Sequence, residues 1–208
     1  MVDRELSFKQ HVENLCKSAG AKVTALSRLV RIVSMEKKKI IMNSFIESQF
    51  SYCPLVWMFN SSRKLNDRIN RIHERGLRLV YDDYTSSFKE LLNKDESVTV
   101  HHRNIQLVAI EMFKVKNGLC PEIFKDLFLL NPNNTGSFLI PNVNSEFMGK
   151  LSLRYFGPVV WETMLPESYK KINVLGKFKD DIKKWVPECK CRLCKTYIGG
   201  VGFTETFT

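Results

Sequence analysis

Hydrophobic residues recur every three or four positions through the first 80 residues, a spacing typical of helices with one apolar face. The first such stretch covers residues 8–33. Its apolar positions are Val12, Leu15, Ala19, Val23, Leu26, Val30 and Val33. Ser7 and Gln10 form an S-x-x-Q capping box at its start. We therefore predict an amphipathic helix over residues 8–33.

Two more helices follow from the same spacing. Ser34 is a suitable N-cap, with Glu36 in the first turn, and the pattern continues until Pro54, which ends or kinks a helix. Residues 50–59 are too apolar to face water and are predicted to lie in the core. The next helix is predicted over residues 64–80.

Turn and cap signals define the elements that come next. A turn is predicted over residues 82–86, and Ser87 with Glu90 forms a second capping box that opens a short helix. A longer helix is expected near residues 99–117, with Gly118 as its C-terminal stop. Pro121 precedes a further short helix over residues 122–130.

The pattern changes at residue 131. Residues 131–137 are a loop by their turn chemistry, residues 138–140 and 151–156 are predicted as two strands of a short β-hairpin, and residues 173–185 return to helical spacing. The fold class expected is mainly α: a helical bundle followed by a small mixed region with a short β-hairpin and a terminal helix. The predicted segments are a helical region (1–130), a small α+β region (131–187) and a Cys-containing tail (188–208).

Charge adds an indication of the partner. The 208 residues carry a formal net charge of +10, with a pI near 9.3. The charge is +8 over residues 1–80, −3 over residues 81–149 and +5 over residues 150–208. Such a balance favours a polyanion such as nucleic acid, or an anionic membrane surface. No signal pattern or membrane-spanning run is found in the sequence, so an intracellular location, nuclear or cytoplasmic, and no membrane partner are expected.

The sharpest candidate site lies on the helix predicted over residues 64–80. Its arginines, spaced 3, 4 and 3 residues apart, fall within a wedge of roughly 80°. With the two preceding basic residues, the candidate nucleic-acid-binding set is Arg63, Lys64, Arg68, Arg71, Arg75 and Arg78. Guanidinium groups in such a row can contact successive phosphates bidentately. A solvated helix face is the alternative. Lys37, Lys38 and Lys39 add little, since three consecutive residues cannot share one face.

Aromatic residues and cysteines form two weaker candidates. Five aromatic side chains could stack on bases, although core packing is the favoured interpretation: Phe45, Phe50, Tyr52, Trp57 and Phe59. Cys189, Cys191 and Cys194 form C-x-C-x-x-C, half of which has zinc-knuckle spacing. Tetrahedral zinc needs a fourth ligand, and no His or Cys follows Cys194. Zinc and plain reduced thiols therefore both remain open for the tail.

No catalytic residue is expected in this chain. Asp82 and Asp83 follow a helix and precede a capping box, so we interpret them as turn residues and not as a polymerase metal pair. His101 and His102 are adjacent and would point about 100° apart on a helix. No glycine-rich phosphate loop and no serine or cysteine nucleophile motif is present in the sequence.

Taken in order, these segments resemble the C-terminal part of reverse transcriptases from non-LTR (LINE-type, jockey-like) retrotransposons, the region after the polymerase palm. The resemblance covers nearly the whole chain. It is carried by KLNDRINRIHERGLRLVYDDY at 64–84, SLRYFGPVVWETMLPE at 152–167 and FKDDIKKWVPECKCRLCKTYIGGVGF at 178–203, with further blocks at 6–29, 41–59 and 86–119.

The resemblance implies an RNA-directed DNA polymerase as the parent protein, encoded by a transposable element. This chain would be its thumb-like, non-catalytic fragment, which binds template–primer, RNA or an RNA–DNA duplex. The catalytic aspartates and their Mg²⁺ would belong to the palm upstream. Some relatives end in a Cys-Cys-His-Cys knuckle, which this tail does not reproduce. Two other functions stay open: a protein-interaction module whose apolar helix faces dock on the palm, and a truncated reading frame with no selected function.

Overall fold

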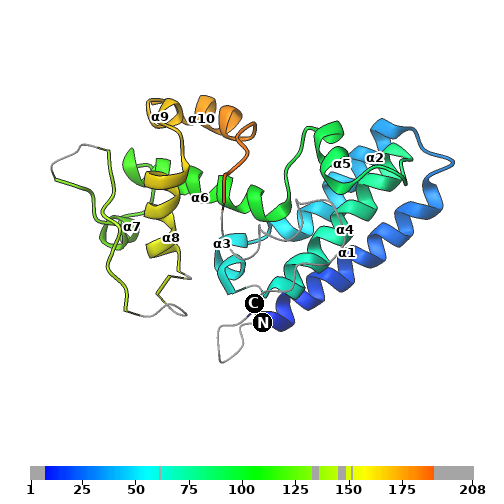
Figure 1. Cartoon of the computed structure of the whole chain (residues 1–208), viewed down its shortest axis with the longest axis horizontal. Coiled ribbons are helices and arrows are strands. Elements are labelled where there is room, and N and C mark those ends of the chain that lie inside the picture. The colour runs from blue at the N-terminus through cyan, green and yellow to red at the C-terminus, as the bar shows by residue number, and fades with distance from the viewer. Residues whose placement is uncertain (1–7, 61, 133–135, 145–148, 151, 190–208) are drawn as a thin grey trace, which may run out of the picture. The chain divides into compact units, whose positions relative to one another are not determined.

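The computed structural model describes residues 8–60, 62–132, 136–144, 149–150 and 152–189 (Figure 1). Contacts divide these residues into two compact units. Unit 1 consists of residues 8–52 and 62–100, and unit 2 consists of residues 53–60 and the described part of 101–189. These units are defined by contacts. The division of the chain after residues 130 and 187 was drawn from the sequence pattern and stays a prediction.

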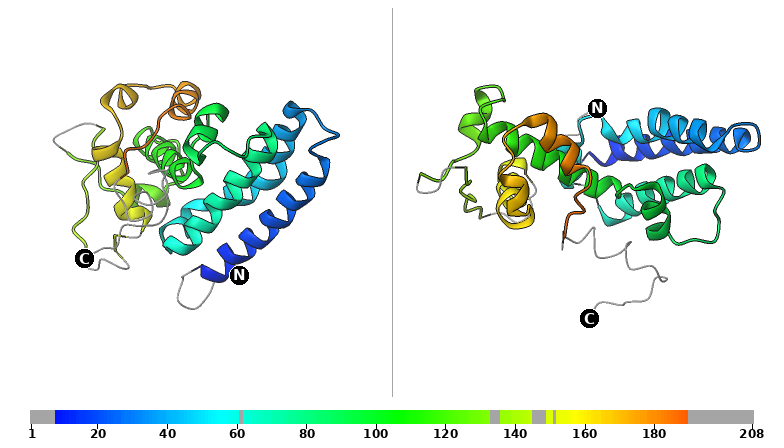
Figure 2. Two further views of the ribbon diagram at one scale, coloured as in Figure 1. Left: turned by 45° about the vertical axis from the view of Figure 1, so that its right-hand side comes forward. Right: turned by 90° about the horizontal axis from the view of Figure 1, so that it is seen from above.

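Unit 1 is a bundle of three successive passes of the chain, of which the second runs opposite to the first and the third. The outward passes are α1 (Lys9–Leu29) and α4 (Arg63–Tyr81), which lie side by side in Figures 1 and 2. The return pass consists of α2 (Met35–Ile41), a π-helical turn η1 (Met42–Ile46) and a 3₁₀ segment η2 (Glu47–Ser51). The predicted apolar stripe of the first helix is buried at Val12, Cys16, Ala19, Val23 and Leu26.

The return pass is anchored on α4 by a close approach at Gly76. A Cβ at this glycine would overlap the Sδ and Cε of Met42, which is 1% exposed. Gly76 therefore makes room for a methionine at the first residue of the π-helical turn. The irregular backbone over residues 42–51 replaces the regular helix that the hydrophobic spacing predicted.

Local caps explain where α4 and α5 begin. The Ser62 hydroxyl accepts a hydrogen bond from the Leu65 amide at 3.3 Å, which caps the N-terminus of α4. The predicted capping box at α5 (Phe88–Asp95) is confirmed, because Glu90 accepts from the Ser87 amide at 2.7 Å and Ser87 accepts from the Glu90 amide at 3.3 Å. Between the two helices, Asp83 accepts hydrogen bonds from Ser86 and Thr85, which confirms it as a turn residue.

Unit 2 is organised on the long helix α6 (Val100–Lys116). The helix ends at Lys116, and the predicted stop, Gly118, follows it with a φ of +66°. Leu119 donates to the Lys114 carbonyl at 2.8 Å and Gly118 donates to the Val115 carbonyl at 3.2 Å, the two bonds of a Schellman motif. The remaining helical segments of the unit are α3 (Pro54–Trp57), η3 (Met58–Asn60), α7 (Ile123–Leu127), α8 (Leu153–Val159), η4 (Val160–Met164), α9 (Glu167–Lys170) and α10 (Leu175–Ile182).

Aromatic rings form the core of unit 2. Phe113 of α6 stacks on Phe178 of α10 with ring centroids 4.4 Å apart, and Trp161 of η4 lies 6.2 Å from Phe178. Phe138 packs edge-on against Trp161 at 5.9 Å. The Trp161 indole nitrogen also donates to the Gly136 carbonyl at 3.2 Å, so the loop before Phe138 is held on this core.

The predicted β-hairpin is wrong for the residues that the structure describes. Residues 153–159 form helix α8, and Phe138 makes only an isolated antiparallel bridge with Leu130. The alternating stretch over residues 151–156 was too short to distinguish the two-residue period of a strand from the 3.6-residue period of a helix. When the stretch is extended, residues 153, 156, 157, 160 and 161 show helical spacing, and the last three are buried. The prediction of a mainly α fold is confirmed, whereas the predicted β-hairpin of the small mixed region is not.

Several helix boundaries also differ from the prediction. The first helix stops at Leu29, four residues early, and its N-cap residue is Phe8, with φ +51° and no side-chain cap. Ser7, the proposed cap, lies outside the described residues. In the terminal region, α10 begins at Leu175, and the short helix α9 was not predicted.

Candidate nucleic-acid interface

Helix α4 has one buried side and one charged side. All its positions from 160° to 340° around the axis, counted from Arg63, are buried, including Leu65, Ile69 and Val80. Lys64, Arg68, Arg71 and Arg75 lie between 80° and 140° and are exposed. Amphipathic spacing therefore places these four cations on the side of α4 that faces away from the core of unit 1.

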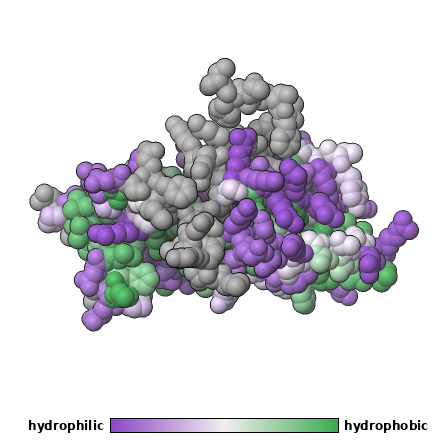
Figure 3. Space-filling model, turned by 90° about the horizontal axis from the view of Figure 1, so that it is seen from below, coloured by the Kyte–Doolittle hydropathy of each residue, from purple (hydrophilic) through white to green (hydrophobic). Residues whose placement is uncertain are grey.

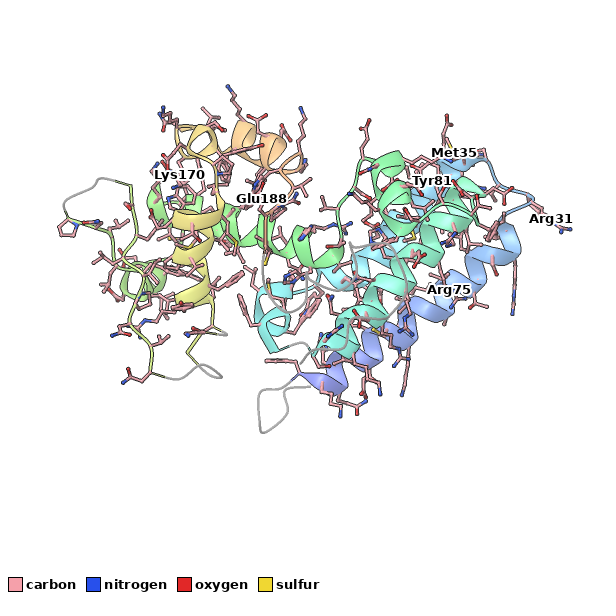
Figure 4. All side chains as sticks on the ribbon, viewed as in Figure 1. Arg31, Met35, Arg75, Tyr81, Lys170 and Glu188 are labelled. Atoms are coloured by element: carbon pink, nitrogen blue, oxygen red, sulfur yellow. The ribbon has the colours of Figure 1, made fainter. Side chains whose placement is uncertain are left out.

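The four cations are spread along the helix. Lys64 and Arg75 are 11 residues apart, a rise of about 16 Å, and Arg68 and Arg75 are about 10 Å apart along the axis. One strand of a duplex presents a phosphate about every 3.4 Å along its axis, so about three phosphates span the distance from Arg68 to Arg75. We call Arg63, Lys64, Arg68, Arg71 and Arg75 the α4 basic face. Figure 4 labels Arg75, and Figure 3 shows hydrophilic side chains over the helices of unit 1.

Arg78, the sixth residue of the predicted set, is engaged within the protein. Its Nη2 atom lies 2.7 Å from Glu74 Oε1, and its Nη1 atom donates to the Asp83 carbonyl at 3.4 Å. Its side chain is 22% exposed. Arg78 thus fixes the turn after α4, because its guanidinium is engaged by Glu74 and the Asp83 carbonyl.

One carboxylate lies at the edge of the α4 basic face. Asp67 stands four residues from both Arg63 and Arg71, and its Oδ1 atom is buried without a hydrogen-bond partner. Burial raises the pKa of Asp67, while the charges of Arg63 and Arg71 lower it. The carboxylate reduces the positive field of the face without forming a hydrogen bond through this oxygen.

Two of the three lysines of α2 are buried or paired within unit 1. Lys38 is 6% exposed, and Lys39 Nζ lies 2.9 Å from Asp95 Oδ1. The Tyr81 hydroxyl donates to the same carboxylate oxygen at 2.7 Å (Figure 4 labels Tyr81). The hydrogen bond from Lys39 to Asp95 raises the pKa of Lys39, and burial raises the pKa of Tyr81. The cluster joins α2, α4 and α5 and is interpreted as structural.

The aromatic candidates divide into two groups. Phe50, Trp57 and Phe59 are 2%, 3% and 8% exposed, which confirms the prediction of core packing for them. Phe45 and Tyr52 are 59% and 71% exposed, so the same prediction is wrong for these two. Both stand on the irregular segment η1–η2 or directly after it, where the backbone no longer follows the helical period.

Of the three tail cysteines, only Cys189 belongs to the described residues; Cys191 and Cys194 lie outside them. Cys189 Sγ lies 4.0 Å from His101 Nε2, a contact between residues 88 positions apart that the sequence could not reveal. Within the described ranges, no group of three or more His, Cys, Asp or Glu side chains is placed to hold a metal ion. No helix in those ranges is long and apolar enough to cross a membrane.

Comparison with known proteins found no matching family, curated protein or solved structure. The functional interpretation therefore depends on the residues themselves and on the resemblance described above.

Proposed function

We propose that this chain binds nucleic acid through the α4 basic face, as the thumb-like segment of a non-LTR retrotransposon reverse transcriptase. The observation that carries the proposal is the exposure of Lys64, Arg68, Arg71 and Arg75 on one side of α4, opposite the buried half. In this function the chain holds RNA or an RNA–DNA duplex, and the chemistry of DNA synthesis belongs to the polymerase palm of the parent protein.

The contacts expected are to the phosphate backbone. Arginine presents two parallel N–H donors to a phosphate, and its charge does not vary in the physiological pH range. Contacts of this kind position a strand but carry no sequence information. Binding to the α4 basic face is therefore expected to be insensitive to sequence and strongly dependent on salt.

A salt titration of the whole chain tests the proposal. The affinity for an RNA–DNA duplex is measured at several salt concentrations by fluorescence anisotropy, first for the unmodified chain and then for a variant with Arg68, Arg71 and Arg75 all changed to Gln. Log K falls as log salt rises, and each lost phosphate contact reduces the magnitude of this negative slope by about 0.7–0.9. The triple variant should therefore lose about 2–3 units of slope and bind more weakly to every sequence tried.

Two controls separate the site from general charge. Arg78→Gln should leave the slope unchanged, because this guanidinium is bound by Glu74 and the Asp83 carbonyl. A variant with Lys177, Lys179 and Lys184 changed to Gln removes three exposed charges of unit 2 and should also keep the slope. Equal losses in both triple variants would show that binding follows net charge alone, and would refute a site on α4.

A second candidate function is docking on the polymerase palm through apolar side chains. The buried stripe of α1 is already covered within unit 1, but Leu29, Ile32, Met35 and Ile40 are 39%, 81%, 52% and 63% exposed around the turn between α1 and α2 (Figure 4 labels Met35). Changing Ile32 and Met35 to Ser should abolish binding to a separately produced palm domain if this surface is used. Unchanged binding would exclude this surface.

A further inference from the structure

Two extended segments of unit 2, which follow α7, pair as a short antiparallel ribbon (Figure 1). Leu130 and Phe138 lie opposite each other at its centre. Two backbone hydrogen bonds flank this pair: Leu139 N–H to Leu129 C=O at 2.8 Å, and Asn131 N–H to Ser137 C=O at 2.9 Å. In such a pattern the central pair exchanges no hydrogen bond. The N–H and C=O groups of Leu130 and of Phe138 therefore point outward, to opposite edges of the ribbon.

One edge of the ribbon is closed by unit 2 itself. The Phe138 amide, which points to that edge, donates a hydrogen bond to the Glu162 carboxylate of η4. Phe138 is 3% exposed and packs on Trp161, so this edge lies against the aromatic core. A further strand can therefore join the ribbon through the edge of residues 129–131.

The edge of residues 129–131 is open, and we call it the open edge. Among the residues that the structure describes, none forms a hydrogen bond with the N–H or the C=O of Leu130. The side chains of Leu129 and Leu130 are 57% and 50% exposed. A strand edge with free backbone groups is a template for pairing with another chain.

The open edge lacks the charged side chains that usually protect such edges. No charged residue occurs between Asp126 and Glu146, although the chain has 32 Lys+Arg and 22 Asp+Glu. Leu139, opposite Leu129, is 42% exposed. A strongly acidic or basic partner finds no charge to pair with here, whereas an apolar strand does fit. Two copies of a chain with a net charge of +10 repel each other, and a contact through this uncharged stretch adds nothing to that repulsion.

The backbone geometry selects a second copy of the chain as the occupant. Leu130 presents both its N–H and its C=O to the open side. When two copies approach antiparallel about a twofold axis at this residue, each Leu130 pairs with the other, and two reciprocal hydrogen bonds form. The two leucine side chains also meet, because directly opposite residues have Cβ atoms about 4.5–5.5 Å apart. The open edge is thus self-complementary, which is the requirement for a symmetric dimer.

We infer that this chain forms a reversible homodimer in which the open edges of two copies pair antiparallel and join the two ribbons into one four-stranded sheet. The contact involves few residues, so it belongs with small, transient interfaces below about 1,200 Å². It uses no residue of the α4 basic face and does not depend on the proposed nucleic-acid function.

Sedimentation velocity of the whole chain over a range of concentrations tests the inference. The unmodified chain should change reversibly from monomer to dimer as its concentration rises, and should stop at the dimer because pairing covers both open edges. Leu130→Lys and Leu130→Glu each place like charges opposite each other across the twofold axis, so each should weaken dimerisation by more than about tenfold. An equimolar mixture of the two variants should dimerise again, because opposite charges then meet, and salt should reduce this recovery.

Ile32→Lys is the matched control. Ile32 is 81% exposed in the turn between α1 and α2, so this variant adds the same charge outside the open edge and should dimerise like the unmodified chain. Circular dichroism checks that each variant keeps its helices. Three results overturn the inference: a chain that is monomeric at every concentration, a folded Leu130→Lys variant that dimerises as tightly as the unmodified chain, or a mixture of the two Leu130 variants that associates no better than each alone.

Discussion

The close approach of Gly76 to Met42 makes an unusual prediction about stability. Glycine inside an exposed helix costs about 1 kcal/mol relative to alanine, so Gly→Ala in a helix normally stabilises a protein. At Gly76 the added methyl group would overlap the sulfur and terminal carbon of Met42, a side chain only 1% exposed that would have to shift within the core. Overpacking of a buried site costs about 1–3 kcal/mol. Gly76→Ala should therefore lower the free energy of unfolding, by about 1 kcal/mol net of the helical gain.

Gly20 of α1 is the matched control. A methyl group at this position would meet no atom within 4 Å, so Gly20→Ala should show the helical gain of about 1 kcal/mol without the loss. Urea unfolding followed by circular dichroism measures both variants. The three tryptophans, Trp57, Trp161 and Trp185, all belong to unit 2, so fluorescence reports that unit separately.

A double-mutant cycle identifies the cause. Met42→Ala alone should cost about 2–5 kcal/mol, as expected for truncation of a buried side chain. In the background of Met42→Ala, the change Gly76→Ala should become favourable, because the overlapping atoms are gone. The two residues should therefore show a coupling energy of about 1 kcal/mol or more. If Gly76→Ala stabilises the unmodified chain as much as Gly20→Ala does, the packing argument fails.

Three further predictions concern single side chains of unit 1. Asp67 has a raised pKa caused by burial, so its charged form opposes folding at neutral pH and this effect disappears as the pH falls through that pKa. Asp67→Asn should raise the melting temperature at pH 7 but not at pH 3, and should strengthen duplex binding; a lower melting temperature at pH 7 would contradict the argument. Burial raises the pKa of Cys16 to about 11, whereas Cys53 is exposed, so mass spectrometry after brief alkylation at pH 8 should find Cys53 modified and Cys16 not. Equal modification would mean that Cys16 is accessible in the native state. Ser87→Ala removes the half of the capping box in which the Ser87 hydroxyl accepts from the Glu90 amide, and should cost about 1 kcal/mol in urea unfolding; no change would show that α5 does not need this cap.

The elements that were predicted well are those with a local stop or start signal. Helices α4, α5 and α6 begin or end at Ser62, Ser87 and Gly118, whose cap geometry is determined by a few neighbouring residues. Local chemistry of this kind is readable from sequence because it does not depend on distant contacts. In the return pass of unit 1, Ser34 marks the start of α2, but no local signal marks the change to a π-helical turn at Met42, the residue that packs on Gly76.

Helix α8 shows the opposite case. It contains Pro158 in its interior, has no side-chain cap at Ser152 and begins with an alternating stretch, so local signals argued against a helix. Burial of Trp161 and Val160, both 0% exposed, against the aromatic core overrides these preferences. Tertiary packing decided the structure here, and a single sequence does not report it.

The candidate site was predicted in outline only. The side of α4 that carries the arginines follows from the helical period, and the exposure of Arg68, Arg71 and Arg75 agrees with it. The pairing of Arg78 with Glu74 was available from the i, i+4 spacing of an acid and a base. The contact of His101 with Cys189 could not be predicted, because no local pattern connects residues 88 positions apart.

The Gln106 side-chain amide of α6 donates to the Trp185 carbonyl at 2.6 Å, an attachment that has a consequence for biosynthesis. The two residues are 79 positions apart, so at 5–20 residues per second the ribosome needs about 4–16 s to make the second after the first. During that time α6 is made but lacks Phe178, which completes its aromatic stack. The apolar side of α6 is therefore exposed in the nascent chain for seconds, long enough for chaperone binding or misassembly. Unit 2 is expected to complete its fold only after residue 185 has left the exit tunnel.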